Sequence, residues 1–193
     1  MSNFHLGAKT FIDKLDINNS IILEIGSERG EGSTAWFDAV AKDLNKEFYS
    51  VDVTDHASTT LAHLKNTNLI VTSAGSVWTK DNLNKKISVL YLDNYDWIST
   101  MNNIRPVEQE LINEYDSRGV NMSNFDCQRE HLEQMINCMP YMDEQSIVIC
   151  DDTPFDKSSG VYFGKNGPVI PYLVIHGYKV YRFENGVILT RGM

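Results

Sequence analysis

Short runs of β-branched and other apolar residues alternate along the chain with stretches of helical periodicity. Five such runs, each ending near a polar or acidic residue, lie at 21 to 25, 48 to 53, 69 to 74, 88 to 93 and 146 to 151. Several are apolar at consecutive positions, as strands covered on both faces are. The alternation predicts parallel strands joined by crossover helices, which is the α/β class.

The C-terminal region breaks this alternation. GYKVYRF (177 to 183) and GVILTR (186 to 191), joined by Glu184 and Asn185, predict an antiparallel hairpin. Pro168 and Pro171 suit the entry of a helix before this hairpin, and Gly177 suits its end. The predicted fold is a Rossmann-like, seven-stranded, mostly parallel sheet with helices on both faces and an antiparallel last strand.

Helices are predicted over 33 to 45, 57 to 65 and 126 to 142. The last is the clearest, because apolar residues recur in it at offsets of three, four and seven, and we expect this stripe to face the core; it consists of Leu132, Met135, Ile136 and Met139. The segment 98 to 125 before it is long for a crossover, and Pro106 should break or start a helix there. Such an insertion either covers a site or is a solvated elaboration.

Length, composition and net charge limit the classes of protein that the chain can belong to. The chain has 193 residues, of which 42% are hydrophobic, so we expect one domain over 1 to 193 with the inserted segment 98 to 125. Seventeen Lys and Arg against 26 Asp and Glu give a net charge of −9, which argues against a nucleic-acid partner. No apolar run reaches the length of a membrane span, and no signal peptide is evident, so we expect a soluble cytoplasmic protein. The three cysteines form no CxxC pair and should be free thiols, and the sequence leaves a homo-oligomer open.

The stretch IILEIGSERGEGSTAWF (21 to 37) carries the first candidate chemistry. Its glycines allow a tight strand-to-helix turn and a close approach to a ligand, and the helix start with its hydroxyls attracts a phosphate or a carboxylate; these residues are Gly26, Gly30, Gly32, Ser33 and Thr34. No Gly-Lys-Ser/Thr follows, which argues against a P-loop, and the spacing does not give G-x-G-x-x-G. Asp52 lies 26 residues beyond Gly26, near the offset at which an acid meets a ribose, so an adenosine-containing ligand is favoured.

A second group of acidic residues follows the fourth and fifth strands. Asp93, Asp151 and Asp152 should meet at the carboxyl edge of the sheet, where their charges repel one another unless a cation lies among them. Oxygen ligands suit Mg²⁺ or Ca²⁺, with Mn²⁺ as a further candidate. The alternative is that Asp151 or Asp152 caps the next segment while Asp93 faces water.

The order Glu24-Ile-Gly26-Ser-x-x-Gly30-x-Gly32-Ser33-Thr34 resembles the first motif of class I S-adenosylmethionine-dependent methyltransferases. The similarity covers nearly the whole chain, since Asp52 matches the ribose-binding acid and YLDNYDW and CDDT match the fourth and fifth strand ends. It implies that S-adenosylmethionine is the cofactor and that Glu24 helps to hold the glycine loop and the amino group. The cofactor-binding residues that it implies are Glu24, Gly26, Ser27, Gly30, Ser33, Thr34, Asp52, Ser73, Asp93 and Asn94.

Within that class, the strand ends resemble those of the metal-dependent catechol and macrocin O-methyltransferases. The resemblance implies that Asp93, Asp151 and Asp152 hold a divalent metal, which chelates substrate hydroxyls and lowers their pKa. In catechol-type enzymes a lysine that acts as the catalytic base lies three residues after the first of these acids, but this chain has Asp96 at that position. Asp96 could take a proton, bind the metal or do neither, and His131 is an alternative base.

A few further residues are candidates by position only. His176 is another alternative base, Trp97 should lie with Asn94 near the adenine or the substrate mouth, and Lys157 and Lys165 could meet an anionic substrate. The predicted catalytic group is therefore Asp93, Asp96 and His131.

The function expected from these residues is a metal-assisted O-methyltransferase that acts on a hydroxylated small molecule. A sugar or polyol is preferred over a catechol because the lysine is missing. Two alternatives stay open: a cofactor-binding relative without methyl transfer, and another enzyme of this fold that uses S-adenosylmethionine or a nucleotide sugar. Neither a nucleic acid nor a membrane is expected as a partner.

Overall fold

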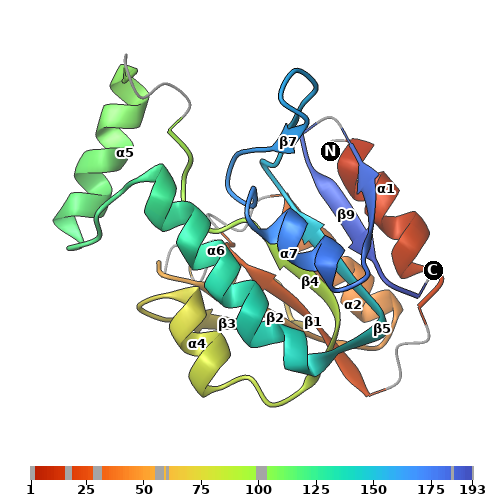
Figure 1. Cartoon of the computed structure of the whole chain (residues 1–193). Helices are drawn as coiled ribbons and strands as arrows, with labels where there is room; N and C mark the ends of the chain where they lie inside the picture. The colour runs from red at the N-terminus through yellow and green to blue at the C-terminus, as the bar shows by residue number, and fades with distance from the viewer. Residues whose placement is uncertain are drawn as a thin grey trace.

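A computed structural model describes residues 3–15, 19–27, 32–54, 59, 61–98, 104–183 and 185–192 (Figure 1). Its helices are α1 (Asn3–Ile12), α2 (Ser33–Asp43), α4 (Gly75–Asp81), α5 (Pro106–Ser117), α6 (Asn124–Cys138), the 3₁₀ turn η1 (Met139–Tyr141) and α7 (Val169–Ile175). The main sheet contains β1 (Ser20–Ile25), β2 (Glu47–Asp52), β3 (Thr67–Val71), β4 (Lys86–Leu92), β5 (Met142–Cys150), β8 (Lys179–Arg182) and β9 (Val187–Thr190). A small separate hairpin pairs β6 (Phe155–Asp156) with β7 (Val161–Tyr162).

The seven strands of the main sheet lie in the order β3-β2-β1-β4-β5-β9-β8. The strands β1 to β5 pair in parallel, and β9 is antiparallel to both of its neighbours. This arrangement confirms the predicted Rossmann-like α/β sheet with its reversed last strand. The strand order reverses between β1 and β4, and in open parallel sheets the crevice at such a point, at the carboxyl edge, is where ligands bind.

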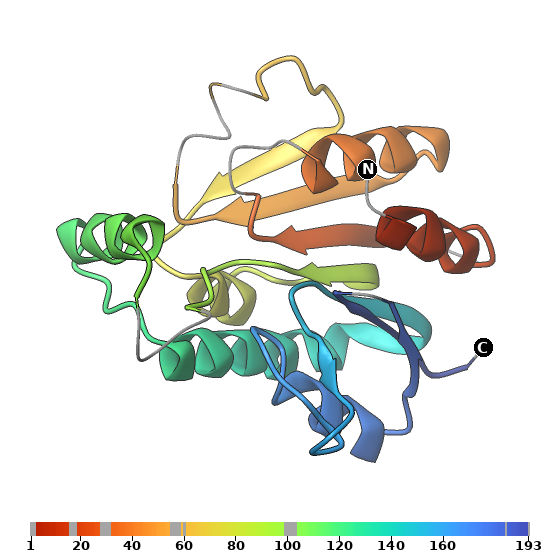
Figure 2. The ribbon, with the colours of Figure 1, turned by 90° about the horizontal axis from the view of Figure 1, so that it is seen from above.

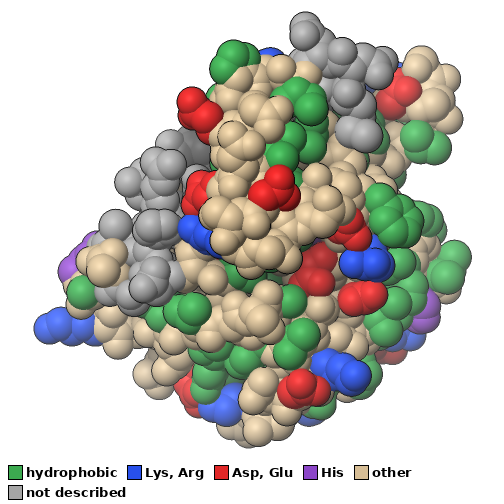
Figure 3. Space-filling view, turned by 90° about the vertical axis from the view of Figure 1, so that its left-hand side faces the viewer, with side chains coloured by type: hydrophobic (Ala, Val, Ile, Leu, Met, Phe, Trp, Pro, Cys, Tyr) green, Lys and Arg blue, Asp and Glu red, His purple; other side chains and the backbone are tan. Residues whose placement is uncertain are grey.

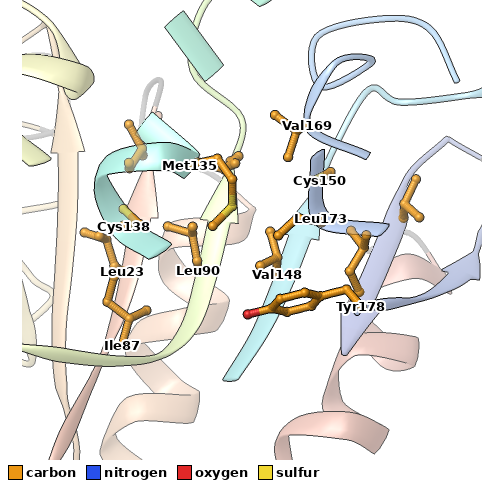
Figure 4. Packing of buried hydrophobic residues seen from close by; sticks show 14 of the residues in the cluster. Leu23, Ile87, Leu90, Met135, Cys138, Val148, Cys150, Val169, Leu173 and Tyr178 are labelled. Atoms are coloured by element: carbon orange, nitrogen blue, oxygen red, sulfur yellow. The ribbon is translucent and has the colours of Figure 1, made fainter. Parts of the chain in front are cut away.

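Helices cover both faces of the sheet (Figure 2). On one face α1 and α2 pack over alternate strand residues such as Ile22 and Val89. On the other face α4, α6 and α7 pack over the intervening residues, including Leu23 and Leu90. Figure 4 shows this second core, in which Met135 and Cys138 of α6 and Leu173 of α7 lie against β4 and β5. Each buried aliphatic side chain stabilises the fold by roughly 1.5 to 3 kcal/mol.

The predicted helix 126 to 142 is α6, but its end was placed too far along the chain. Pro140 cannot continue the α-helical hydrogen bonds, so the helix gives way to η1, and β5 begins at Met142. Its buried face is also rotated from the predicted stripe. Met135 is buried as expected, whereas Ile136 is 45% exposed, and His131 and Gln134 are buried instead.

Some of the remaining helices were predicted from the sequence and others were not. As expected, Pro106 begins α5, while α7 is entered through Pro168 and followed by Gly177 with a positive φ. The helices α1 and α4 were not predicted. Of the predicted helix 57 to 65, residue 59 is helical and residues 61 to 65 belong to no helix, while 57, 58 and 60 lie outside the described residues.

Helix α5 stands away from the sheet, beyond the edge toward which the parallel strands point (Figures 1 and 2). It lies within the segment 98 to 125 that was predicted as an insertion, and only Glu108 of its residues is buried. Within the described ranges, no helix combines the length and the apolar character that crossing a membrane would need. Cys127, Cys138 and Cys150 are buried free thiols, as predicted.

One face of the molecule is shown as a surface in Figure 3, where acidic, basic and hydrophobic side chains are interspersed. The excess of acidic residues is therefore not concentrated in a single acidic patch on this face.

Candidate functional site

The turn after β1 touches the turn after β4 directly. Gly26 has a φ of +101°, and a Cβ on it would lie 2.5 Å from Asn94 Cα and from Asp93 C. The backbone also joins the strand ends here, because Asp93 N donates to Ile25 O at 2.9 Å. Only glycine fits this combination of a positive φ and a close backbone approach. The predicted glycine corner and the first acidic residue of the second group are thus neighbours.

Glu24 lies in the middle of the sheet, one residue before the end of β1. Its register places it beside Ser50 on β2 and Tyr91 on β4. Ser50 Oγ donates to Glu24 Oε2 at 2.6 Å, whereas Oε1 is buried without a hydrogen-bond partner within the described part of the chain. Burial raises the pKa of Glu24 to about 7, while the hydroxyl of Ser50 acts in the opposite direction. A buried acceptor without a donor costs free energy unless a ligand supplies one.

The start of α2 completes this corner. The N-cap residue of α2, Gly32, has a φ of +77° and, as a glycine, offers no side chain to cap the helix. Thr34 is buried and its Oγ1 has no partner among the described residues. The hydroxyls of Ser33 and Thr34 approach Glu24 and lower its pKa, against the effect of burial. The predicted Gly30 lies outside the described residues.

Asp52 ends β2 next to this corner. Its Oδ2 accepts hydrogen bonds from Ser27 N at 2.8 Å and from Ser27 Oγ at 3.3 Å, and its Oδ1 accepts one from Thr54 N at 2.8 Å. Asp52 is partly exposed, so it can also meet a ligand. An unpartnered acceptor at Glu24, an unpartnered hydroxyl at Thr34, a glycine turn and an acid on the next strand therefore lie together at the place where the resemblance predicts the cofactor.

The second acidic group is held by two other side chains. Tyr91 Oη donates to Asp151 Oδ2 at 2.6 Å and lies 3.2 Å from Asp93 Oδ2. Lys165 Nζ donates to Asp93 Oδ1 at 2.8 Å and lies 3.1 Å from Asp152 Oδ2. The structure therefore brings Asp93, Asp151 and Asp152 to one place, as predicted.

Electrostatics differ between the members of this group. Desolvation raises the pKa of Asp93, the attraction of Lys165 lowers it and repulsion by Asp151 raises it, and together these effects bring it to about 6. Burial by itself would lower the pKa of Lys165, but Asp93 and Asp152 outweigh it and raise that pKa, so the ammonium stays charged. Desolvation, with Asp93 and Asp151 as neighbours, also raises the pKa of Tyr91, so its hydroxyl stays protonated.

These three carboxylates do not form the predicted metal site in the structure. No group of three or more His, Cys, Asp or Glu residues in the described part of the chain is arranged to hold a metal ion. The physical reason is that Lys165 lies between Asp93 and Asp152 and supplies a positive charge there. The residues as arranged do not fit a divalent ion.

Asp96 contacts the inserted segment. Tyr115 of α5 donates its hydroxyl to Asp96 Oδ2 at 3.1 Å and accepts from Asp96 N at 3.2 Å. Tyr95, in the left-handed region with a φ of 63°, packs against Tyr115 with the two rings tilted and their centroids 5.0 Å apart. These contacts fasten α5 to the loop after β4, close to the acidic group.

His131 is buried in α6. Its Nδ1 donates to Cys127 O at 2.8 Å, and Nε2 has no partner in the described part of the chain. Burial lowers the pKa of His131 to about 3, so the ring is neutral at ordinary pH. His176, the other alternative base, is exposed at the C-terminal end of α7, which leads away from the carboxyl edge of the sheet.

The other positional candidates fall in different surroundings. Asn94 follows β4 beside Gly26, and its Oδ1 is buried without a partner among the described residues. Ser73 is exposed between β3 and α4, and Trp97 is partly buried. Lys157 lines a surface hollow of the β6–β7 hairpin, and only Lys165 reaches the acidic group.

Three residues at the site were not predicted. Tyr91 occupies an apolar strand position, where its hydroxyl gives no signal in the sequence, and Tyr115 lies in the insertion. Asn166 bridges β4 and β5, since its Nδ2 donates to Leu92 O at 3.2 Å and to Asp151 O at 3.0 Å. Lys165 was a candidate together with Lys157, but for contact with an anionic substrate and not as the partner of these carboxylates.

Comparison with known proteins adds information on the fold. Neither the models of known protein families nor the curated proteins give a match. Among solved structures, the chain is similar to SMU.1697c from Streptococcus mutans, inferred to be a methyltransferase, in complex with S-adenosylhomocysteine; the TM-score is 0.57 at 12% identity, over 98% of each chain. It is also similar to CalS11, a TDP-rhamnose 3′-O-methyltransferase of calicheamicin biosynthesis, with a TM-score of 0.58 at 14% identity over 98% of this chain and 79% of that one.

A third similar structure is LepI in complex with S-adenosylmethionine, with a TM-score of 0.55 at 10% identity, over 95% of this chain and 46% of LepI. The chain therefore has the fold of class I S-adenosylmethionine-dependent methyltransferases.

Proposed function

We propose that the protein transfers a methyl group from S-adenosylmethionine to an oxygen of a hydroxylated small molecule. The observation that carries this proposal is the meeting of Glu24, Gly26 and Asp52 at the carboxyl edge, where the strand order reverses. Structures of the same fold bind S-adenosylmethionine or S-adenosylhomocysteine, which supports the choice of cofactor.

The binding roles follow from the contacts. Glu24 Oε1 is an acceptor in need of a donor, which the amino group of the cofactor would supply, and Asp52 would accept from the ribose hydroxyls. Gly26 lets the cofactor approach the backbone. When bound, the cofactor supplies a methyl group on a sulfonium, whose transfer needs an aligned nucleophile and little else from the protein.

Asp93 is the proposed proton acceptor. It lies at the end of β4 beside the glycine corner, keeps 25% of its side chain exposed, and has a pKa raised to about 6 by desolvation. A base with a pKa near the working pH is efficient. As the acceptor oxygen bonds to the methyl carbon, the carbon–sulfur bond breaks with its electron pair on sulfur, and the hydroxyl proton passes to Asp93. Asp96 and His131 stay predictions for this role.

The acceptor class rests on the acidic surroundings. The carboxylates of Asp93 and Asp152 can accept hydrogen bonds from hydroxyls, so a sugar or polyol suits this edge, and the similar structure of CalS11 is that of a sugar O-methyltransferase. Assistance by Mg²⁺, which the sequence predicted, is not part of this proposal, because an ion would first have to displace Lys165 from both carboxylates.

The cofactor assignment is tested by calorimetry with S-adenosylhomocysteine. Asp52→Ala should weaken binding by about 1 to 3 kcal/mol, the cost of losing a charged hydrogen-bond partner. Asp52→Asn keeps one acceptor oxygen and should lose less, while Asp81→Ala, an exposed residue at the end of α4, makes the same charge change and should bind like the wild type.

Two results would contradict the assignment. Unchanged affinity of Asp52→Ala would remove Asp52 from the ribose contacts, and a wild type that binds no S-adenosylhomocysteine would refute the proposed function. Binding without any turnover of S-adenosylmethionine, across a panel of sugars and polyols, would favour the alternative of a cofactor-binding relative.

A further inference from the structure

Lys165 is an almost fully buried cation at the carboxyl edge of the sheet. Its side chain is 8% exposed, and its ammonium lies 2.8 Å from Asp93 Oδ1 and 3.1 Å from Asp152 Oδ2. A buried ammonium is costly unless carboxylates compensate for the lost hydration. The three carboxylates carry a charge of −3 and the ammonium +1, so the group keeps a charge of −2.

The backbone around Lys165 is built to hold it there. Gly164, with a φ of +82°, packs so closely on Asp152 that a Cβ would collide with the carbonyl oxygen of Asp152. Lys165 N donates to that same oxygen at 3.1 Å. Asn166 ties the segment to the ends of β4 and β5. Asp152 itself has a φ of 45°, an uncommon conformation for a residue other than glycine.

Both carboxylate oxygens of Asp151 are also engaged. Asp151 Oδ1 accepts from Asp152 N at 2.8 Å, and Asp151 Oδ2 accepts from Tyr91 Oη at 2.6 Å. A divalent ion at this place would have to displace a buried ammonium and compete with these hydrogen bonds. Lys165 therefore compensates part of the negative charge of the group, and Tyr91 and the backbone of Asp152 orient Asp151.

We propose that Lys165 takes the place of the divalent ion expected in a metal-assisted methyltransferase, and that its ammonium binds the oxygen of the acceptor. This inference rests on the proposed function. A lysine ammonium has three N–H donors. Two of them point to Asp93 and Asp152, and the third has no partner within the described part of the chain, so it can donate to the oxygen of the acceptor molecule. Donating to that oxygen favours its loss of a proton as a metal ion would.

The charge of the group further limits the acceptor. With a net charge of −2 the site repels anionic molecules and favours a neutral one whose hydroxyl groups donate to the carboxylates. The part of the acceptor that meets this group is therefore neutral and polyhydroxylated, such as a sugar ring, and the prediction that Lys165 meets an anionic substrate is not favoured.

The experiment titrates Mn²⁺ into the full chain in the presence of S-adenosylhomocysteine and measures free Mn²⁺ by electron paramagnetic resonance. The wild type should show no specific site, whereas Lys165→Met leaves the carboxylates without their cation and should bind Mn²⁺ at least about tenfold more tightly. Lys157→Met, an exposed lysine on the β6–β7 hairpin, makes the same charge change and should behave like the wild type. Circular dichroism checks that each variant is folded.

Each outcome decides the inference. A wild-type Mn²⁺ site that Asp152→Asn abolishes would overturn it, and so would a folded Lys165→Met variant that gains no affinity for Mn²⁺. If Lys165→Met does not fold, the wild type and Asp152→Asn decide alone: a site lost in Asp152→Asn overturns the inference, and the absence of a site supports it. Because the titration involves no methyl transfer, it can fail while cofactor binding stands, and the reverse also holds.

Discussion

Replacing Gly26 with alanine tests the close contact between the turns after β1 and β4. The new Cβ would lie 2.5 Å from Asn94 Cα and from Asp93 C, which are backbone atoms and cannot swing aside. A φ of +101° adds strain of about 1 to 2 kcal/mol for a residue with a Cβ. Overpacking of a well-packed region costs about 1 to 3 kcal/mol more. The expected loss of folding free energy is therefore about 2 to 5 kcal/mol.

The matched control is Gly160→Ala in the β6–β7 hairpin. Gly160 has a φ of +74°, but a Cβ there would meet no atom of the described residues within 4 Å. It carries only the strain of the positive φ, about 1 to 2 kcal/mol. The difference between the two variants thus isolates the contact with the Asp93–Asn94 peptide.

Urea unfolding followed by tryptophan fluorescence measures both free energies. Relief of the clash in Gly26→Ala must move Asp93 and Asn94, so calorimetry should also show S-adenosylhomocysteine binding weakened more than about tenfold, or about 1.4 kcal/mol. Gly160→Ala should bind as the wild type does. If Gly26→Ala is no less stable than Gly160→Ala, the reasoning about this contact is refuted.

Two further predictions concern Glu24 and Tyr115. Burial raises the pKa of Glu24 from 4.5 to about 7, so the folded state binds the proton more tightly than the unfolded state and stability falls as the pH rises between these values. In Glu24→Gln this pH dependence, up to about 3 kcal/mol of unfolding free energy, should disappear. Urea unfolding from pH 4 to 8 should therefore give a flatter plot of unfolding free energy against pH than for the wild type. A plot with the wild-type slope would contradict the raised pKa. Tyr115→Phe loses the hydrogen bond to Asp96, worth about 1 kcal/mol. Backbone hydrogen exchange in residues 106–117 should therefore become faster, while the affinity for S-adenosylhomocysteine is kept. Tyr162→Phe is the control. Exchange in α5 that stays as slow as in the wild type would show that Tyr115 does not hold the helix.

Most of the sheet could be predicted because its strands are apolar at consecutive positions. All seven were expected at or near their observed places, and the hairpin at the C-terminus gave the reversed strand. The errors lie at boundaries and at short helices. Pro140 ends α6 before the predicted residue 142, and α4, with seven residues, is too short to show a periodic pattern.

The candidate cofactor site could be predicted from short segments of the sequence. Glu24, Gly26 and Asp52 are each placed by the strand that they end or follow, so their meeting at one edge needs only the parallel topology. The contacts of the inserted segment could not be predicted in this way, because no pattern in residues 98 to 125 indicates that Tyr115 bonds to Asp96.

The amino-acid sequence by itself determined the alternation of strands and helices, the glycine turn and the placing of three carboxylates at strand ends, since these depend on neighbours along the chain. Only the tertiary structure decided what lies among those carboxylates. Lys165 is 72 residues from Asp93 in the sequence, and their pairing depends on the packing of Gly164 against Asp152 and on Asn166 bridging two strands. Charge compensation acts through space, so a pattern that is read along the chain predicts a cation there without showing that the chain provides its own.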